Sequence, residues 1–76
     1  MADRKNDFNK AREGYLAALR ADPRMGDARY NLALLTLRHG AVDEARHHAG
    51  KLAEIAPADP RNAGLARILA GAAPGR

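Results

Sequence analysis

Residues 26–59 read GDARYNLALLTLRHGAVDEARHHAGKLAEIAPAD, two helix-forming stretches with one glycine between them. Asp27 can cap the first helix, and Gly40 can end it because glycine readily adopts the left-handed conformation that follows many helices. Asp43 can cap the second helix, which must stop before Pro57. A link of a few residues makes consecutive helices antiparallel neighbours, so this stretch predicts a helical hairpin.

The flanking segments predict one further helix on each side. Upstream, Asn6 or Asp7 can cap a helix that Pro23 ends. Downstream, Asp59 followed by Pro60 is a favourable helix start, because proline is tolerated where the first N–H has no partner. We therefore expect a single small domain, residues 1–76, with helices over residues 7–22, 28–39, 44–56 and 60–72.

The composition supports an all-α fold. Alanine, the best helix former, supplies 18 of the 76 residues. Strand-favouring residues are scarce, with one Val, two Ile, one Thr, one Phe, two Tyr and no Trp. There is no Cys for a disulfide or a thiolate metal site. A chain of this length rarely gains more than roughly 3–5 kcal/mol from one core, so we expect a small, marginal core.

The formal net charge of +4 invites a nucleic-acid function, but the charge distribution argues against it. Residues 1–24 carry a net charge of +2, residues 25–60 a net charge of −1, and residues 61–76 a net charge of +3. The cations alternate with acids, and the aromatic side chains that stack on bases are missing. Nucleic-acid binding is therefore the less favoured hypothesis; its cations would be Arg4, Lys5, Arg61, Arg67 and Arg76.

No targeting or membrane segment is evident. No apolar run approaches the roughly 18–20 residues of a transmembrane helix. The basic start is followed by polar residues and not by the apolar stretch of a secretory signal. We expect a cytoplasmic protein without a membrane span, and the abundance of Ala and Arg without Ser or Gln is typical of a GC-rich bacterial genome.

The sequence repeats itself at a fixed offset. Ala11-Arg12 recurs as Ala45-Arg46, and Pro23 recurs as Pro57. A period of this length, about 34 residues, is typical of helical repeat proteins. A repeat that begins at Gly26 resembles a tetratricopeptide (TPR) repeat at Asn31, Leu32, Gly40, Ala45 and Pro57. The upstream segment resembles the second helix of such a repeat, at Phe8, Ala11, Tyr15, Ala18, Leu19 and Pro23.

Some positions depart from the family pattern. Arg29 stands where the family has Trp, Ala33 where it has Gly, Thr36 where it has Tyr, and Ala49 where it has an aromatic residue. The lost bulk weakens the core of the full repeat.

The resemblance covers about residues 6–60 and implies antiparallel hairpins in a right-handed stack. In it, residues 7–22 form a lone second helix, residues 26–59 a full repeat and residues 60–73 a capping helix. Two registers stay open for the capping helix, because one repeat offset aligns Leu69 with Leu35 and a longer one aligns Leu69 with Leu34.

The resemblance also implies a binding surface, because the first helices of TPR repeats line a concave groove that holds a peptide or a helix. The groove positions in this sequence are Asp27, Tyr30, Asn31, Leu34, Leu37 and Arg38, extended by Leu65 and Leu69. Leu32 and Leu35 lie on another face of the same helix and are expected to pack against the helix over residues 44–56. The family's carboxylate clamp keeps only Asn31 here, which favours an apolar or amphipathic ligand.

The expected function is therefore a non-catalytic adaptor or accessory subunit that binds a partner helix or peptide. The alternative is a self-assembling protein whose groove is filled by its own copies. A third arrangement is a closed four-helix bundle, in which the outer helices cover both apolar faces of the helix over residues 28–39 and leave no open groove.

The sequence offers little support for catalysis or a cofactor. Nucleophilic catalysis needs a Ser, Cys or Thr beside a base, and the one candidate, Thr36, is mid-helix, where its hydroxyl is expected to bond to a backbone carbonyl. His47 and His48 are adjacent, so they diverge by about 100° on a helix and cannot both face one ion. We expect His39, His47 and His48 to be solvated surface residues, with no metal, no cofactor and no enzymatic activity.

Overall fold

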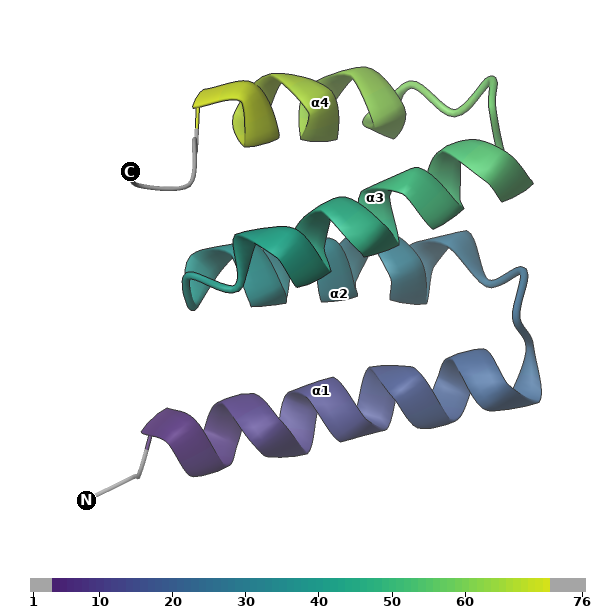
Figure 1. The fold of residues 1–76 in the computed structure, drawn as a ribbon. Coiled ribbons are helices and arrows are strands. Elements are labelled where there is room, and N and C mark those ends of the chain that lie inside the picture. The colour runs from purple at the N-terminus through teal and green to yellow at the C-terminus, as the bar shows by residue number, and fades with distance from the viewer. Residues whose placement is uncertain (1–3, 72–76) are drawn as a thin grey trace.

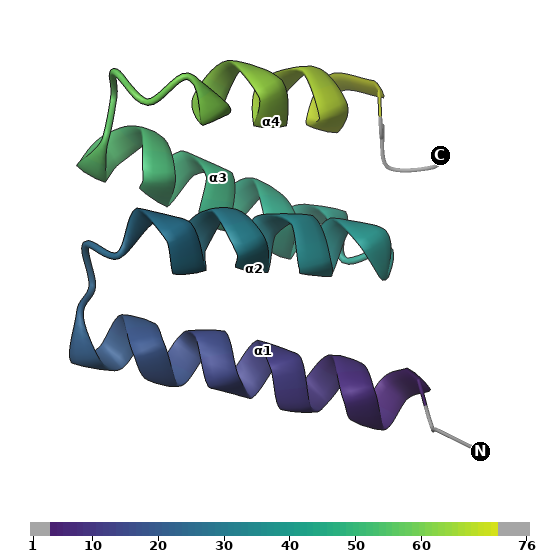
Figure 2. The ribbon, with the colours of Figure 1, turned by 180° about the vertical axis from the view of Figure 1, so that it is seen from behind.

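The computed structural model describes residues 4–71, which form four α-helices and no strand. The helices are α1 (Arg4–Ala21), α2 (Gly26–Arg38), α3 (Val42–Ile55) and α4 (Arg61–Gly71). They form a flat stack in which α1 and α4 are the two outer edges, with α2 and α3 paired between them (Figure 1). Figure 2 shows the same order from behind. The all-α fold class is confirmed, whereas the TPR-type arrangement of the hairpins stays a prediction.

Three of the expected caps are wrong. The first helix begins at Arg4, so Asn6 and Asp7 lie inside it. The cap residues of α2 and α3 are Met25 and Ala41, and neither makes a side-chain cap. Asp27 and Asp43 lie instead in the first turn of their helices, where a negative charge still favours the positive end of the helix dipole.

The fourth start and the helix ends agree better with the sequence. Oδ1 of Asp59 accepts the backbone N–H of Arg61 at 2.9 Å, as expected of a capping aspartate. Gly40 has a φ of 82°, and the backbone N–H of Ala41 donates to the carbonyl of Thr36 at 2.9 Å, which closes the end of α2. Residues 72 and 73, expected at the end of α4, lie outside the described residues.

The core consists of two clusters on opposite faces of α2. The first joins α1 to α2 and contains Leu19, Ala28 and Leu32, with Tyr15, Leu16, Ala18 and Leu35 packed around them. The second joins α2, α3 and α4 and contains Ala33, Leu52 and Leu65, surrounded by Tyr30, Leu34, Ala49, Ile55 and Ala56. Leu32 and Leu35 therefore pack against α1, and the expectation that they face α3 is wrong.

Small residues explain why α3 takes the other face of α2. Ala33 and Ala45 are each only 1% exposed. Ala33 packs with Leu52, and Ala45 lies two turns before Leu52 on the same side of α3. Alanine lets two helices approach closely, so the face of α2 that carries Ala33 accepts α3, while the bulkier face with Leu32 contacts the leucine side chains of α1.

Candidate interaction surface

The predicted groove residues lie on the adjacent helices α2 and α4, but the structure exposes them unequally. Asp27, Asn31 and Arg38 are exposed, and Tyr30, Leu34 and Leu37 are half-buried. Leu65 and Leu69 are buried at 1% and 8% exposure. The expectation that these two leucines extend the groove is corrected, because both are buried within the stack and offer little area to a partner.

One surface residue was missed by the sequence prediction. Ile68 in α4 is 44% exposed, more than any other large apolar side chain among residues 7–71. It occupies the position of Leu34 one repeat later, so the repeat offset contained the signal that could have found it. It also lies one turn from Leu65, which shares a core cluster with Leu34. Leu34 and Leu37 on α2 and Ile68 on α4 are thus the partly open large apolar side chains at these positions, and we name these three residues the α2–α4 face.

Arg61 occupies the end of the predicted groove that lies at the N-terminus of α2. Its guanidinium carbon lies 5.1 Å from the centre of the Tyr30 ring, a cation–π distance. Nη1 donates to Oδ1 of Asp27 at 2.8 Å, and Nη2 donates to Oδ2 of Asp59 at 2.7 Å. Hydrogen bonds from Arg61 lower the pKa of Asp59, and the bonds to Asp59 and then Asp27 raise the pKa of Arg61. Asp27 and Tyr30 are thus engaged within the chain.

Gly26 allows Arg61 to approach the start of α2. A Cβ atom built at Gly26 would lie 3.3 Å from Nη2 of Arg61 and 3.4 Å from a methyl carbon of Leu52. The absence of a side chain lets the start of α2 approach both residues. The contacts of Arg61 with Asp27 and Tyr30 therefore connect the start of α4 to the start of α2.

We predict that Arg61→Met loosens α4. The variant loses both carboxylate partners and the contact with Tyr30 but keeps a long aliphatic side chain. Backbone amides of α4 should exchange with deuterium faster, whereas those of α1 should be unchanged. Arg67→Met is the matched control, because Arg67 is exposed and makes no ion pair with the described residues. Equal deuterium exchange of the α4 amides in the two variants would contradict the role of Arg61 in holding α4.

A partly buried polar network connects the first three helices. Nη1 of Arg29, on α2, lies 3.1 Å from Nδ1 of His48 on α3. Nε2 of His48 lies 3.3 Å from Oε2 of Glu44. Nε of Arg12, on α1, donates to the same Glu44 oxygen at 2.7 Å. His48 is 3% exposed, so the expectation of a solvated histidine is wrong there. A helix face that looks polar in sequence is buried because α1 and α2 both supply polar partners to it.

The hydrogen bonds determine the protonation state of His48. A guanidinium only donates, so Nδ1 of His48 must accept from Arg29, and Nε2–H is left to donate to Glu44. This is a neutral imidazole. Burial lowers the pKa of His48, and the charge of Arg29 acts in the same direction, while the hydrogen bond to Glu44 opposes them. Burial also lowers the pKa of Arg29, whose Nε is buried without an acceptor among the described residues. The network is therefore a structural link between helices.

Glu44 is held ionised by its partners. Burial acts to raise its pKa, but the hydrogen bonds from Arg12 and His48 outweigh burial, so the pKa of Glu44 lies below its usual range.

The chain matches no protein-family model, no curated protein and no solved structure. The resemblance to TPR repeats therefore remains a prediction that rests on the residues quoted above.

The other candidate residues have simple structural surroundings. Thr36 is fully buried, and its hydroxyl donates to the carbonyls of Leu32 at 2.9 Å and Ala33 at 3.1 Å, which confirms the expected back-bond. His47 is exposed, and His39 is exposed and stacks near Phe8, with ring centres 4.3 Å apart.

Within residues 4–71 no three potential metal ligands gather, and no helix of that range is long and apolar enough to cross a membrane.

Proposed function

We propose that this protein is a non-catalytic interaction module, a TPR-like adaptor or accessory subunit that binds a partner helix on the α2–α4 face. The supporting observation is the 44% exposure of Ile68, three residues after Leu65, which packs in one cluster with the half-buried Leu34 of α2. Leu34 and Leu37 are half-buried on the neighbouring helix α2, so three large apolar side chains on α2 and α4 are partly open. Apolar side chains grouped in this way mark interaction surfaces, whereas isolated exposed ones are common.

The surroundings of the face suit a partner helix. Asn31 and Arg38 are exposed on α2 and would form a polar rim around the three apolar side chains. A central apolar contact with a polar rim is the usual anatomy of a protein interface. Because Arg61 closes the N-terminal end of α2, the partner would contact the C-terminal half of α2 and the middle of α4.

The proposal predicts that Ile68→Asp weakens partner binding at least roughly tenfold, a loss of about 1.4 kcal/mol. A charge in the centre of an apolar contact is strongly unfavourable, while the exposed position leaves the helices intact. Leu34 is the poorer target because it also packs against the core. The measurement is affinity capture from cells of the source organism with the wild type, Ile68→Asp and, as control, Ala63→Asp at an exposed α4 position. Identical captured proteins for all three baits would contradict the proposal.

Self-assembly is the second candidate, and one observation favours it. Ala45 is buried where α3 approaches α2, but its counterpart one repeat earlier, Ala11 in α1, is exposed. Ala11 therefore presents a small-residue helix face with no described helix beside it, which a second copy could cover. Sedimentation equilibrium at micromolar concentration separates the candidates: self-assembly requires a mass above 8.2 kDa, and a strictly monomeric chain excludes it.

A further inference from the structure

Arg38 places a positive charge beside the apolar side chains of α2. It follows Leu34 by four residues, so the two side chains lie one helical turn apart on the same side of the helix. The side chain of Arg38 is exposed and makes no ion pair with the described residues. Its charge is therefore open to a partner that contacts Leu34.

Arg67 places a second positive charge beside Ile68 on α4. Ile68 lies between Leu65 and Arg67 around the helix, because residues three positions apart share a face and adjacent residues diverge by about 100°. Leu65 is buried in the cluster that contains Leu34, so Arg67 lies toward the outer edge of α4. Arg67 is exposed and makes no ion pair with the residues that the structure describes. Each of the two helices thus has an open cation next to its open apolar side chains.

α2 and α4 supply no free acid to balance these two charges. Together the two helices contain four arginines and a single acidic residue, Asp27. Oδ1 of Asp27 accepts from Nη1 of Arg61 at 2.8 Å, so this carboxylate is already engaged. The excess of positive charge on α2 and α4 attracts acidic partners and repels basic ones.

The backbone of α4 is open on both sides of Ile68. Gly64 and Gly71 lie about one helical turn before and after it, and both are exposed. A Cβ atom built at either glycine would meet no atom within 4 Å. A partner helix can therefore lie directly over Ile68 without meeting a side chain at either position, which favours close helix packing.

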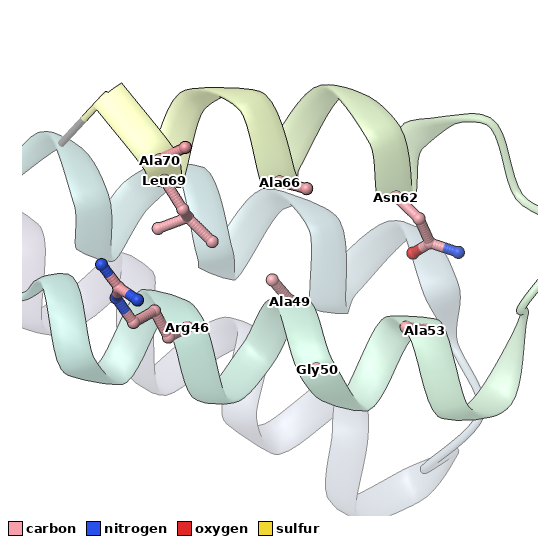
Figure 3. A pocket seen from close by; sticks show the side chains of 8 residues that line it. All are labelled: Arg46, Ala49, Gly50, Ala53, Asn62, Ala66, Leu69 and Ala70. Carbon is pink, nitrogen blue, oxygen red and sulfur yellow. The ribbon is translucent and has the colours of Figure 1, made fainter. Parts of the chain in front are cut away.

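The hollow between α3 and α4, which we name the α3–α4 groove, lacks this combination of charge and open apolar side chains. It has a volume of about 440 Å³. Figure 3 shows small side chains in its middle, with Arg46 at one end and Asn62 at the other. The one large apolar side chain that lines it, Leu69, is only 8% exposed. The α2–α4 face is therefore the better surface for an amphipathic partner.

We propose that the helix bound by the α2–α4 face is acidic and amphipathic. Its large apolar side chains contact Leu34, Leu37 and Ile68, and Asp or Glu along its two edges pairs with Arg38 on one side and Arg67 on the other. This inference rests on the proposed function and specifies the chemistry of the partner. The paired charges speed association and exclude basic helices, while the apolar contacts hold the complex together.

The probe is a displayed library of helical peptides, each about four helical turns long, with leucine on one face and Glu, Gln or Lys at random along both edges of that face. Selection on the full chain should enrich Glu over Lys roughly tenfold at the edge positions, because only a negative charge is favourable beside Arg38 or Arg67. One enriched acidic peptide, and its counterpart with each edge Glu replaced by Lys, are then measured by fluorescence anisotropy.

Arg38→Glu and Arg67→Glu should each weaken the acidic peptide roughly tenfold and strengthen its lysine counterpart. The matched control is Arg20→Glu, which makes the same charge change at an exposed arginine in the last turn of α1. Arg38 likewise lies in the last turn of α2, so the effect of the new charge on the helix end is the same in both variants. Arg20→Glu should leave the affinity for both peptides close to that of the wild type.

Ile68→Gln separates this inference from the proposed function, because it removes the apolar contact without changing the charge. It should weaken the acidic peptide and the lysine peptide alike. If it does so but the selected peptides show no preference for Glu, or Arg38→Glu and Arg67→Glu bind as Arg20→Glu does, the face binds a helix and the charge inference is wrong. If the selected peptides bind Ile68→Gln as tightly as the wild type, or the wild type selects no helical peptide, both proposals are wrong.

Discussion

Replacing Leu52 by alanine is expected to unfold most of the protein at room temperature. Leu52 is fully buried at the centre of the cluster that joins α2, α3 and α4. Truncating a buried leucine costs about 2–5 kcal/mol, from the lost apolar burial and the cavity left behind. A core of this size rarely supplies more than roughly 3–5 kcal/mol in total, so one truncation removes most of the stability. Far-UV circular dichroism should show a large loss of helix.

Ile68→Ala is the control for this prediction. It removes a similar amount of aliphatic side chain from a neighbouring helix, but at a position that is 44% exposed. Its helical signal should remain close to that of the wild type. If the two variants lose the same amount of helix, the cluster around Leu52 does not dominate the stability of the fold.

The second large effect is a loss of stability on mild acidification. His48 is neutral in the fold and its pKa is lowered from an ordinary value of 6.5, so the unfolded chain binds the proton more readily. The stability from neutral His48 is fully present above the ordinary pKa and is lost as pH falls through it toward the lowered folded value. Protonation would also place a donor on Nδ1, opposite the guanidinium of Arg29, 3.1 Å away. The free energy of unfolding should fall by at most about 1.4 kcal/mol per pH unit for this one proton.

Urea unfolding between about pH 7 and pH 5 measures this effect. The lowered pKa of Glu44 acts below its ordinary value of 4.5, so Glu44 does not contribute in that range. His48→Gln is the matched variant, because its amide can accept from Arg29 and donate to Glu44 without titrating. The variant should keep its stability across the range. The same acid loss in both proteins would assign the effect to another group.

The helix boundaries, and the roles of the residues that start or end the helices, were partly predictable from local sequence. Gly40 ends α2 in the left-handed conformation, and Asp59 bonds to the first backbone N–H of α4, because both effects involve residues a few positions apart. Asp27 does not act as a cap, and its carboxylate binds Arg61 on another helix. The start of α2 thus makes a contact with Arg61 of α4 that no local sequence pattern could predict.

The candidate site was less predictable than the fold. Leu34 and Leu37 are half-buried and lie on one side of the helix, as their spacing indicates, and their assignment to a partner groove stays a prediction. Leu65 and Leu69 were assigned to the surface but are buried, and Ile68 was overlooked although it is exposed. Periodicity groups the residues of α4 into a stripe, but which edge of the stripe meets α2 and α3 depends on how α4 docks.

The amino-acid sequence by itself determined the all-α class, the approximate position of the helices and the internal repeat, because helix propensity, glycine and proline act locally. The tertiary structure decided which faces are covered. His48 is buried because Arg12 and Arg29 come to its network from two other helices, and the α3–α4 groove is open because small residues there meet each other. Burial is a property of the neighbours that a side chain receives, and those neighbours are distant in the chain.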